Sequence, residues 1–326
     1  MPGNKKLWLL AGLVLLLLAA TPFIGVVAID LGSLLQQNPG SFIFWQLRLP
    51  RALLGFAAGG ILALSGLVCQ NLFKNSLATP DLLGISSGAA AGTVVALKFN
   101  IQLTFLGIGG LYISSFLGAL SAILFVFIVA RWTRNSSVYT LLMSGVAINF
   151  FYSSIIVIFQ YVFDFSDTFS LLRWLMGGIA VAGYAEVLVL IVLLILFLIW
   201  VFAFRSEFLL ISGGDEFAMS RGLNAAVFRK YSFLALAVFV GAVVSICGPI
   251  GFVALVVPHV SRSWGASRYR TTVGFTFLLG GGLLVAADLL SRLLVPPVEI
   301  PVGIVTSLMG APFFLALLVA QLKKAD

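Results

Sequence analysis

Residues 248–259 read Gly-Pro-Ile-Gly-Phe-Val-Ala-Leu-Val-Val-Pro-His, an apolar stretch that contains two glycines and two prolines. Glycine and proline both disfavour the interior of a helix, so this stretch predicts a short or broken helix instead of an ordinary span. A second short, glycine-rich stretch occupies residues 84–92 (Gly-Ile-Ser-Ser-Gly-Ala-Ala-Ala-Gly). Such segments at corresponding places in two halves of a chain are typical of transporters built from inverted repeats.

The composition around these stretches is that of a membrane protein. Of the 326 residues, 61% are hydrophobic and 9% are charged, and the mean hydropathy is +1.15. Soluble domains have about 45–50% apolar and about 25% charged residues, so a water-soluble fold is excluded. Cys69 and Cys247 lie in apolar stretches without the spacing of metal ligands or a redox motif, so we expect both to be packing residues and no metal site.

Ten apolar segments predict ten transmembrane helices. The first, Leu7 to Ile29, begins like a signal peptide but is longer, so we expect an uncleaved span, followed by a polar connection from Asp30 to Pro50. The other nine segments are residues 52–73, 84–98, 104–130, 138–163, 185–204, 230–247, 250–266, 272–291 and 302–322. The prediction is a single all-α transmembrane domain over residues 1–326, in which spans 2–5 and 7–10 form an inverted repeat.

The basic residues predict the orientation of these spans. A cytoplasmic N-terminus places fourteen of the nineteen Lys and Arg residues inside, as the positive-inside rule requires. The five left outside are Arg48, Arg51, Lys98, Arg173 and Arg292. The even number of spans then places both termini in the cytoplasm. In such a chain the placement of the charges matters more than the net charge of +8, which implies no nucleic-acid partner.

The sequence contains no phosphate-binding G-x-x-x-x-G-K-[ST] loop, so we do not expect the chain to bind ATP itself. A secondary transporter is expected to carry ionisable relay groups within its spans. Here Glu186, His259, Asp288 and Glu299 all fall near span ends. An alternative that stays open is a proton-coupled secondary transporter that uses Asp288, Glu299 or His259 as proton carriers. No catalytic residue is predicted.

The connection from Arg205 to Lys230 contains a predicted seven-residue helix. Asp215 and Glu216 place negative charge in its first turn, Arg221 falls in its last turn, and Gly222 stands at the C-terminal cap position. A short helix of mixed charge suits docking into a groove of a soluble partner. A solvated loop with ordinary caps fits the same residues.

Five stretches of the chain carry a family resemblance, in a fixed order and at matching spacing. They are residues 45–51 (Trp-Gln-Leu-Arg-Leu-Pro-Arg), 66–84, 214–223, 248–259 and 287–312. The sequence resembles the permease subunits of type II ATP-binding-cassette importers, the iron–siderophore, haem and cobalamin permease family. The resemblance covers nearly the whole chain.

The resemblance implies an assembly in the prokaryotic inner membrane. Two copies of the permease would form a homodimer in lipid, two ABC ATPase subunits would bind ATP and Mg on the cytoplasmic side, and a periplasmic or lipid-anchored substrate-binding protein would dock outside. The permease itself would be no enzyme. It would move a bulky metal chelate, such as an iron–siderophore, haem or cobalamin, into the cytoplasm by alternating access.

The resemblance also assigns roles to individual residues. The residues assigned to ATPase coupling are Gly214, Asp215, Glu216, Ala218, Arg221, Gly222 and Leu223. Arg48, Arg51 and Arg292 are assigned to binding-protein docking, because the donor fork of arginine favours paired recognition of carboxylates. Snorkelling at the membrane interface fits the same three residues.

Asn75 and Leu77, at the inner end of the second span, are assigned to the cytoplasmic gate. Ser76 stands where the family usually has proline, which implies a less rigid turn, and Ala254 replaces a common glycine. Residues 164–178 predict a capped external helix that begins at Ser166 or Asp167.

The sequence does not identify the cargo or the residues that bind it. The polar residues of the fifth span fit either a lining of the path or hydrogen bonds between helices. They are Asn149, Tyr152, Ser153, Ser154 and Gln160.

Overall fold

The computed structural model describes residues 2–25, 27, 29, 32, 39–105, 108–132, 137–180, 183–264 and 268–322. Within these ranges the regular structure is helical, apart from the antiparallel two-residue strands β1 (Thr104–Phe105) and β2 (Ile108–Gly109). The chain divides into two compact units. The first unit comprises residues 1–64, 176–187 and 250–326, and the second comprises residues 65–175 and 188–249.

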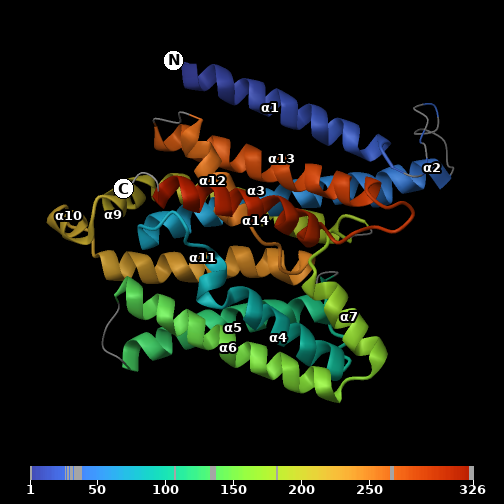
Figure 1. The fold of residues 1–326 in the computed structure, drawn as a ribbon, viewed down its shortest axis with the longest axis horizontal. Coiled ribbons are helices and arrows are strands. Elements are labelled where there is room, and N and C mark those ends of the chain that lie inside the picture. The colour runs from blue at the N-terminus through green and yellow to red at the C-terminus, as the bar shows by residue number, and fades with distance from the viewer. Residues whose placement is uncertain are drawn as a thin grey trace. The chain divides into compact units, whose positions relative to one another are not determined.

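The first unit is a helical bundle in which α1 lies along α13 (Figure 1). Its elements are α1 (Pro2–Ala20), the 3₁₀ turn Thr21–Phe23, α2 (Pro39–Phe42), the π-helical segment Ile43–Arg48, the first part of α3 (Leu49–Phe73), α12 (Val253–Ser263), α13 (Tyr269–Leu293) and α14 (Val302–Leu322). Leu10 and Val14 of α1 pack on Phe275 of α13 in a buried apolar cluster. Helices α12, α13 and α14 contact one another.

The second unit is built around α5, which contacts α4, α6 and α11. Its elements are the end of α3, the 3₁₀ turn Pro80–Leu83, α4 (Ile85–Lys98), α5 (Gly110–Trp132), α6 (Val138–Val162), α7 (Phe165–Leu175), most of α8 (Ala185–Ala203), α9 (Arg205–Ser212), α10 (Asp215–Ser220) and α11 (Ala225–Cys247). Cys69 and Cys247 are both buried.

Seven helices of the described chain are long and apolar enough to cross a membrane. They are Lys5–Phe23, Pro39–Phe73, Gly110–Trp132, Val138–Val162, Ala185–Ala203, Ala225–Cys247 and Tyr269–Leu293. Ile85–Lys98 and Val302–Ala316 are shorter apolar helices. The predicted polytopic, all-helical membrane protein is confirmed, whereas the count of ten spans and the inverted repeat stay predictions.

The first span is shorter than predicted, because α1 ends at Ala20 and not at Ile29. Pro22 has no N–H to donate to the carbonyl of Leu18, four residues earlier. The Thr21 hydroxyl donates to that carbonyl instead, at 3.3 Å, and to the carbonyl of Leu17 at 3.0 Å. The α-helix thus ends where proline lacks an N–H donor, and the Thr21 hydroxyl acts as the donor instead.

The polar connection predicted to extend to Pro50 is wrong at its C-terminal end, since helix is continuous from Pro39 to Phe73. Pro50 has no N–H, and the N–H of Leu49 donates to the carbonyl of Phe44, five residues earlier. This wider spacing produces the π-helical turns just before α3.

The π-helical segment leaves backbone carbonyls that bind another part of the first unit. The carbonyl of Gln46 has no N–H four residues ahead and accepts a 2.9 Å hydrogen bond from the N–H of Gly183. The carbonyl of Trp45 accepts a 2.6 Å hydrogen bond from the Tyr184 hydroxyl. The loop before α8 is therefore fixed by the proline-induced irregularity.

Two other predicted segments differ from the structure only at their ends. The broken segment at 248–259 becomes a helix only at Val253, because Phe252 has a left-handed backbone conformation with φ of 67°. The predicted external helix begins at Phe165, where the N–H of Thr168 donates to the carbonyl of Asp164.

Glycines allow α4 and α5 to touch through their backbones. A Cβ atom added to Gly118 would overlap the carbonyl oxygen of Gly88, and one added to Gly88 would overlap that of Gly118. Close approach of this kind is a main source of helix association in lipid.

We expect Gly118→Ala to lower the thermal unfolding temperature of the detergent-solubilised protein, because the added methyl group must push α4 away from α5. Gly12→Ala is the matched control, since nothing lies within 4 Å of its added Cβ and it also lies inside a helix. Alanine favours a helix by about 1 kcal/mol over glycine, so this control should unfold no earlier than the wild type. Equal unfolding temperatures for the two variants would contradict the proposed backbone contact.

Candidate functional site

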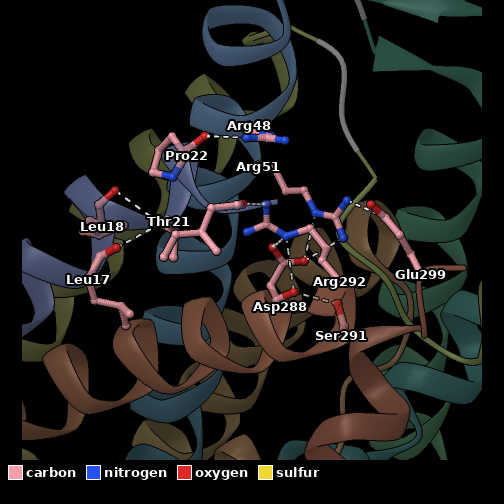
Figure 2. Close-up of polar contacts among 11 residues, drawn as sticks. Leu17, Leu18, Thr21, Pro22, Arg48, Arg51, Asp288, Ser291, Arg292 and Glu299 are labelled. Atoms are coloured by element: carbon pink, nitrogen blue, oxygen red, sulfur yellow. Dashed lines mark hydrogen bonds and ion pairs between the residues drawn. The ribbon is translucent and has the colours of Figure 1, made fainter. Parts of the chain in front are cut away.

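Five charged side chains gather at one end of the first unit, and we call them the arginine cluster (Figure 2). They are Arg48, Arg51, Asp288, Arg292 and Glu299. The π-helical segment and the start of α3 supply two arginines, the end of α13 supplies Asp288 and Arg292, and the connection to α14 supplies Glu299. The three arginines predicted for docking are therefore brought together.

Asp288 is the buried centre of the cluster, with a side chain that is 3% exposed. Its Oδ1 atom lies 2.9 Å from both Nε and Nη2 of Arg51. Its Oδ2 atom lies 3.3 Å from Nε of Arg292, one helical turn away on α13. A buried carboxylate is tolerated only when its charge is compensated, and here two guanidinium groups share that role.

Glu299 is bound differently, because its side chain is 52% exposed. Its Oε2 atom lies 2.7 Å from Nη1 of Arg51. Arg51 therefore bridges one buried carboxylate and one that solvent reaches. Exposed ion pairs contribute about 0–1 kcal/mol, so the Glu299 contact is the weaker of the two.

Arg48 binds backbone carbonyls instead of carboxylates. Its guanidinium donates to the carbonyl oxygens of Pro22 at 3.2 Å and Val27 at 2.6 Å. Within the described part of the chain it forms no ion pair. The arginine cluster thus holds three positive and two negative charges and carries a net positive charge.

A cavity of about 670 Å³ opens beside the arginine cluster and is lined by all of its members except Asp288. Ile43, Leu47 and Pro297 contribute apolar walls. The arrangement can accept an acidic group, because the cluster has unbalanced positive charge and its exposed ion pair is easily rearranged.

From the sequence, Asp288 and Glu299 were expected only as proton carriers of the alternative transporter. Their pairing with the arginines could not be read from it, because 237 residues separate Asp288 from Arg51. Among the described residues, no group of three or more His, Cys, Asp or Glu could hold a metal ion.

We expect Asp288→Asn to destabilise the protein far more than Glu299→Gln. Removing one partner of a buried ion pair costs about 3–5 kcal/mol, because the arginines left behind remain buried. The exposed Glu299 pair should contribute about 0–1 kcal/mol. Thermal unfolding of the two isosteric variants in the same detergent tests this ranking, and equal losses would contradict it.

The predicted coupling helix is present as α10, but it has six residues, Asp215–Ser220, instead of seven. Arg221 is its C-cap residue and not part of its last turn. Gly222 has a φ of 82°, and its N–H donates to the carbonyl of Met219 at 2.9 Å. A glycine in this conformation is a common end for a helix, so the predicted cap is correct.

The rest of this connection is more helical than predicted. Helix α9 (Arg205–Ser212) precedes α10 and was not foreseen, because its mixed apolar and polar residues give no clear cap signal. At the other end, the Asn224 side chain accepts a 3.1 Å hydrogen bond from the N–H of Val227 and caps α11.

Asp215 joins α10 to the turn that follows α3 and to α11, both in the second unit. Its Oδ1 atom lies 2.6 Å from Nζ of Lys74 and 2.8 Å from Nη2 of Arg229. Arg229, whose side chain is 3% exposed, also donates from Nε to the carbonyl of Leu72 at 3.2 Å. The hydrogen bond from Arg229 is the main cause that lowers the pKa of Asp215, so this carboxylate stays ionised at neutral pH.

The predicted gate residues form the turn that follows α3. Lys74 has a left-handed conformation with φ of 53° and ends the helix. The Asn75 side chain then accepts a 2.9 Å hydrogen bond from the N–H of Leu77. Asn75 therefore shapes the turn in the absence of a proline at Ser76. Since Lys74 is also bound to Asp215, α10 and this turn are linked through adjacent residues.

Two of the five polar residues of the fifth predicted span, Asn149 and Tyr152, bind other elements of the second unit. Asn149 donates to the carbonyl of Asp81 at 3.1 Å and accepts from the Ser87 hydroxyl at 2.7 Å. The hydroxyls of Tyr152 and Ser121 lie 2.6 Å apart. These contacts favour the role in hydrogen bonding between helices for Asn149 and Tyr152.

Comparison with known proteins gives a match over nearly the whole chain. Residues 10–320 match the FecCD transport family. The hemin transport system permease protein HmuU of Yersinia pestis is 33% identical, over 98% of both chains. The vitamin B12 import system permease protein BtuC of Klebsiella pneumoniae is 36% identical, over 97% of this chain and 94% of the relative. A solved structure described as an inward-facing conformation of a metal-chelate type ABC transporter is 29% identical, with a TM-score of 0.85 over 97% of this chain and 99% of that chain.

Proposed function

The chain belongs to the FecCD transport family, and we propose that it is the permease subunit of an ATP-driven importer. Its relatives HmuU and BtuC are permease proteins of a hemin transport system and a vitamin B12 import system. The matches cover 98% and 94% of these two relatives, so the proposal concerns the whole chain.

The observation that carries this proposal is the ion-paired attachment of α10. A six-residue helix is too short to be stable alone, yet Asp215 ties it to the ends of α3 and α11. Phe217 and Met219 are exposed apolar side chains on it. An exposed helix fixed in this way suits transmission of motion from a soluble ATPase to the turn at Asn75 and Leu77.

We infer ten spans, which correspond to α1, α3, α4, α5, α6, α8, α11, α12, α13 and α14. With both termini in the cytoplasm, α10 and the proposed gate lie on the cytoplasmic side and the arginine cluster lies outside. Two copies of the permease would pair in the prokaryotic inner membrane, with two ABC ATPases that bind ATP and Mg. The arginine cluster would receive carboxylates of a substrate-binding protein.

The proposed cargo is a bulky metal chelate, such as an iron–siderophore, haem or cobalamin, moved by alternating access. The names of the relatives support this class, since hemin and vitamin B12 are both large metal complexes. The proton-coupled alternative is disfavoured, because Asp288 is bound by two arginines and Glu299 by one. A relay carboxylate must be free to exchange its proton.

The test is uptake into proteoliposomes that contain the permease and its ATPase, with binding protein loaded with cobalamin or haem. We expect uptake that requires ATP and persists when a protonophore dissipates the proton gradient. The variant Asp215→Asn should lower the transport rate, because it removes the charge that holds Lys74 and Arg229 on α10. Uptake that needs no ATP and stops with the protonophore would establish the secondary-transporter alternative.

A second test concerns the proposed docking role of the arginine cluster. Arg48→Glu reverses a charge without removing a partner of Asp288 or Glu299, so the fold should survive. We expect it to weaken stimulation of ATP hydrolysis by the binding protein by at least tenfold, while the permease–ATPase complex still assembles. Arg173→Glu, on the exposed face of α7, is the control. Unchanged stimulation in Arg48→Glu would refute docking at the cluster.

A further inference from the structure

A second cavity, of about 550 Å³, lies in the second unit. Its walls come from the C-terminal end of α5 and the N-terminal ends of α6 and α11. These helix ends lie on the side of the unit that carries α10, since α10 leads into α11 within a few residues. No function described above uses this cavity.

The cavity is positively charged. Arg131 at the end of α5 and Lys230 near the start of α11 line it, and none of its described lining residues is acidic. Both side chains are exposed, and neither forms an ion pair within the described ranges. Nζ of Lys230 lies 6.0 Å from the centre of the Phe127 ring, so the ammonium group is held against the cavity wall.

One wall of the cavity is an apolar stripe. Leu124, Phe127 and Ile128 precede Arg131 by seven, four and three residues, so all four lie on one face of α5. At 1.5 Å per residue, the stripe extends about 10 Å along the helix from the basic end. A charged group bound by Arg131 would therefore have an apolar surface directly beneath it.

Exposed aromatic residues give the depth of this cavity in a membrane. Trp132 follows Arg131 and is 80% exposed, and Tyr139 in the first turn of α6 is 71% exposed. Tyr231, next to Lys230, is also exposed. Exposed Trp and Tyr at the ends of apolar helices mark the level of the lipid headgroups. The basic end thus lies among headgroups, and the stripe reaches toward the hydrocarbon.

We propose that this cavity binds an anionic phospholipid, with its phosphate between Arg131 and Lys230 and part of one acyl chain along Leu124, Phe127 and Ile128. A basic pocket between helices on one side of a membrane is a typical site for anionic headgroups. A soluble anion would leave the apolar stripe without a partner. A zwitterionic headgroup carries the same phosphate but adds a cation of its own, which Arg131 and Lys230 would repel.

The test is native mass spectrometry of the full-length chain in detergent, titrated with phosphatidylglycerol or phosphatidylcholine of the same chain length. We expect preferential binding of phosphatidylglycerol to the wild type. Each basic residue near an anionic lipid should contribute about fivefold, so Arg131→Gln combined with Lys230→Gln should weaken binding about 25-fold. Lys98→Gln combined with Arg173→Gln removes the same charge elsewhere in the unit and should leave binding unchanged.

Two further measurements decide between a lipid and a soluble anion. Phe127→Ala keeps both cations but removes most of the apolar stripe, so it should weaken phosphatidylglycerol binding. Glycerol 3-phosphate, which carries the headgroup charge without acyl chains, should not displace the lipid. Equal binding of the two lipids to the wild type, or an equal loss in both double variants, would overturn the proposal. Efficient displacement by glycerol 3-phosphate would also overturn it, in favour of a soluble-anion site.

Discussion

The hydrocarbon of a bilayer offers no hydrogen bonds, so a membrane protein must satisfy its backbone polar groups within the chain. Two irregular points of the described structure obey that constraint. Where Pro22 lacks an N–H, the hydroxyl of Thr21 donates to the open carbonyl. Where Pro50 lacks one, the backbone of Gly183 donates to Gln46. Pro22 and Pro50 thus determine where a helix ends or widens. The groups that donate in their place determine which segment packs at that point.

The same constraint governs the charges, because an isolated buried ion is even less tolerated than an unpaired carbonyl. Two groups of charged side chains share the same arrangement, in which one carboxylate is bound by two cationic side chains from different parts of the chain. Asp288 joins Arg51 of α3 to Arg292 of α13 in the first unit. Asp215 joins Lys74 to Arg229 in the second. Both clusters lie at helix ends, where charge can be held without crossing the membrane core.

Most helices could be predicted from the sequence, because long apolar segments and caps such as Asn224 and Gly222 are local signals. The errors arose where a distant contact decides the local structure. The carbonyl of Gln46 finds its donor at Gly183, and the role of Asp288 depends on Arg51, which lies 237 residues away. The family resemblance indicated which arginines belong together, but their internal partners could not be read from spacing along one helix.

The half-exposed Glu299 gives Arg51 an internal ligand of the same chemical type as the proposed incoming carboxylate. An acidic partner that arrives there would exchange one carboxylate for another, so the number of ion pairs on Arg51 would not change. The affinity of such a contact is the difference between the free energies of two similar ion pairs, the one gained and the one lost on Arg51. It is therefore small. A substrate-binding protein held in this way would be released as readily as it is captured. One molecule of it could then deliver cargo repeatedly.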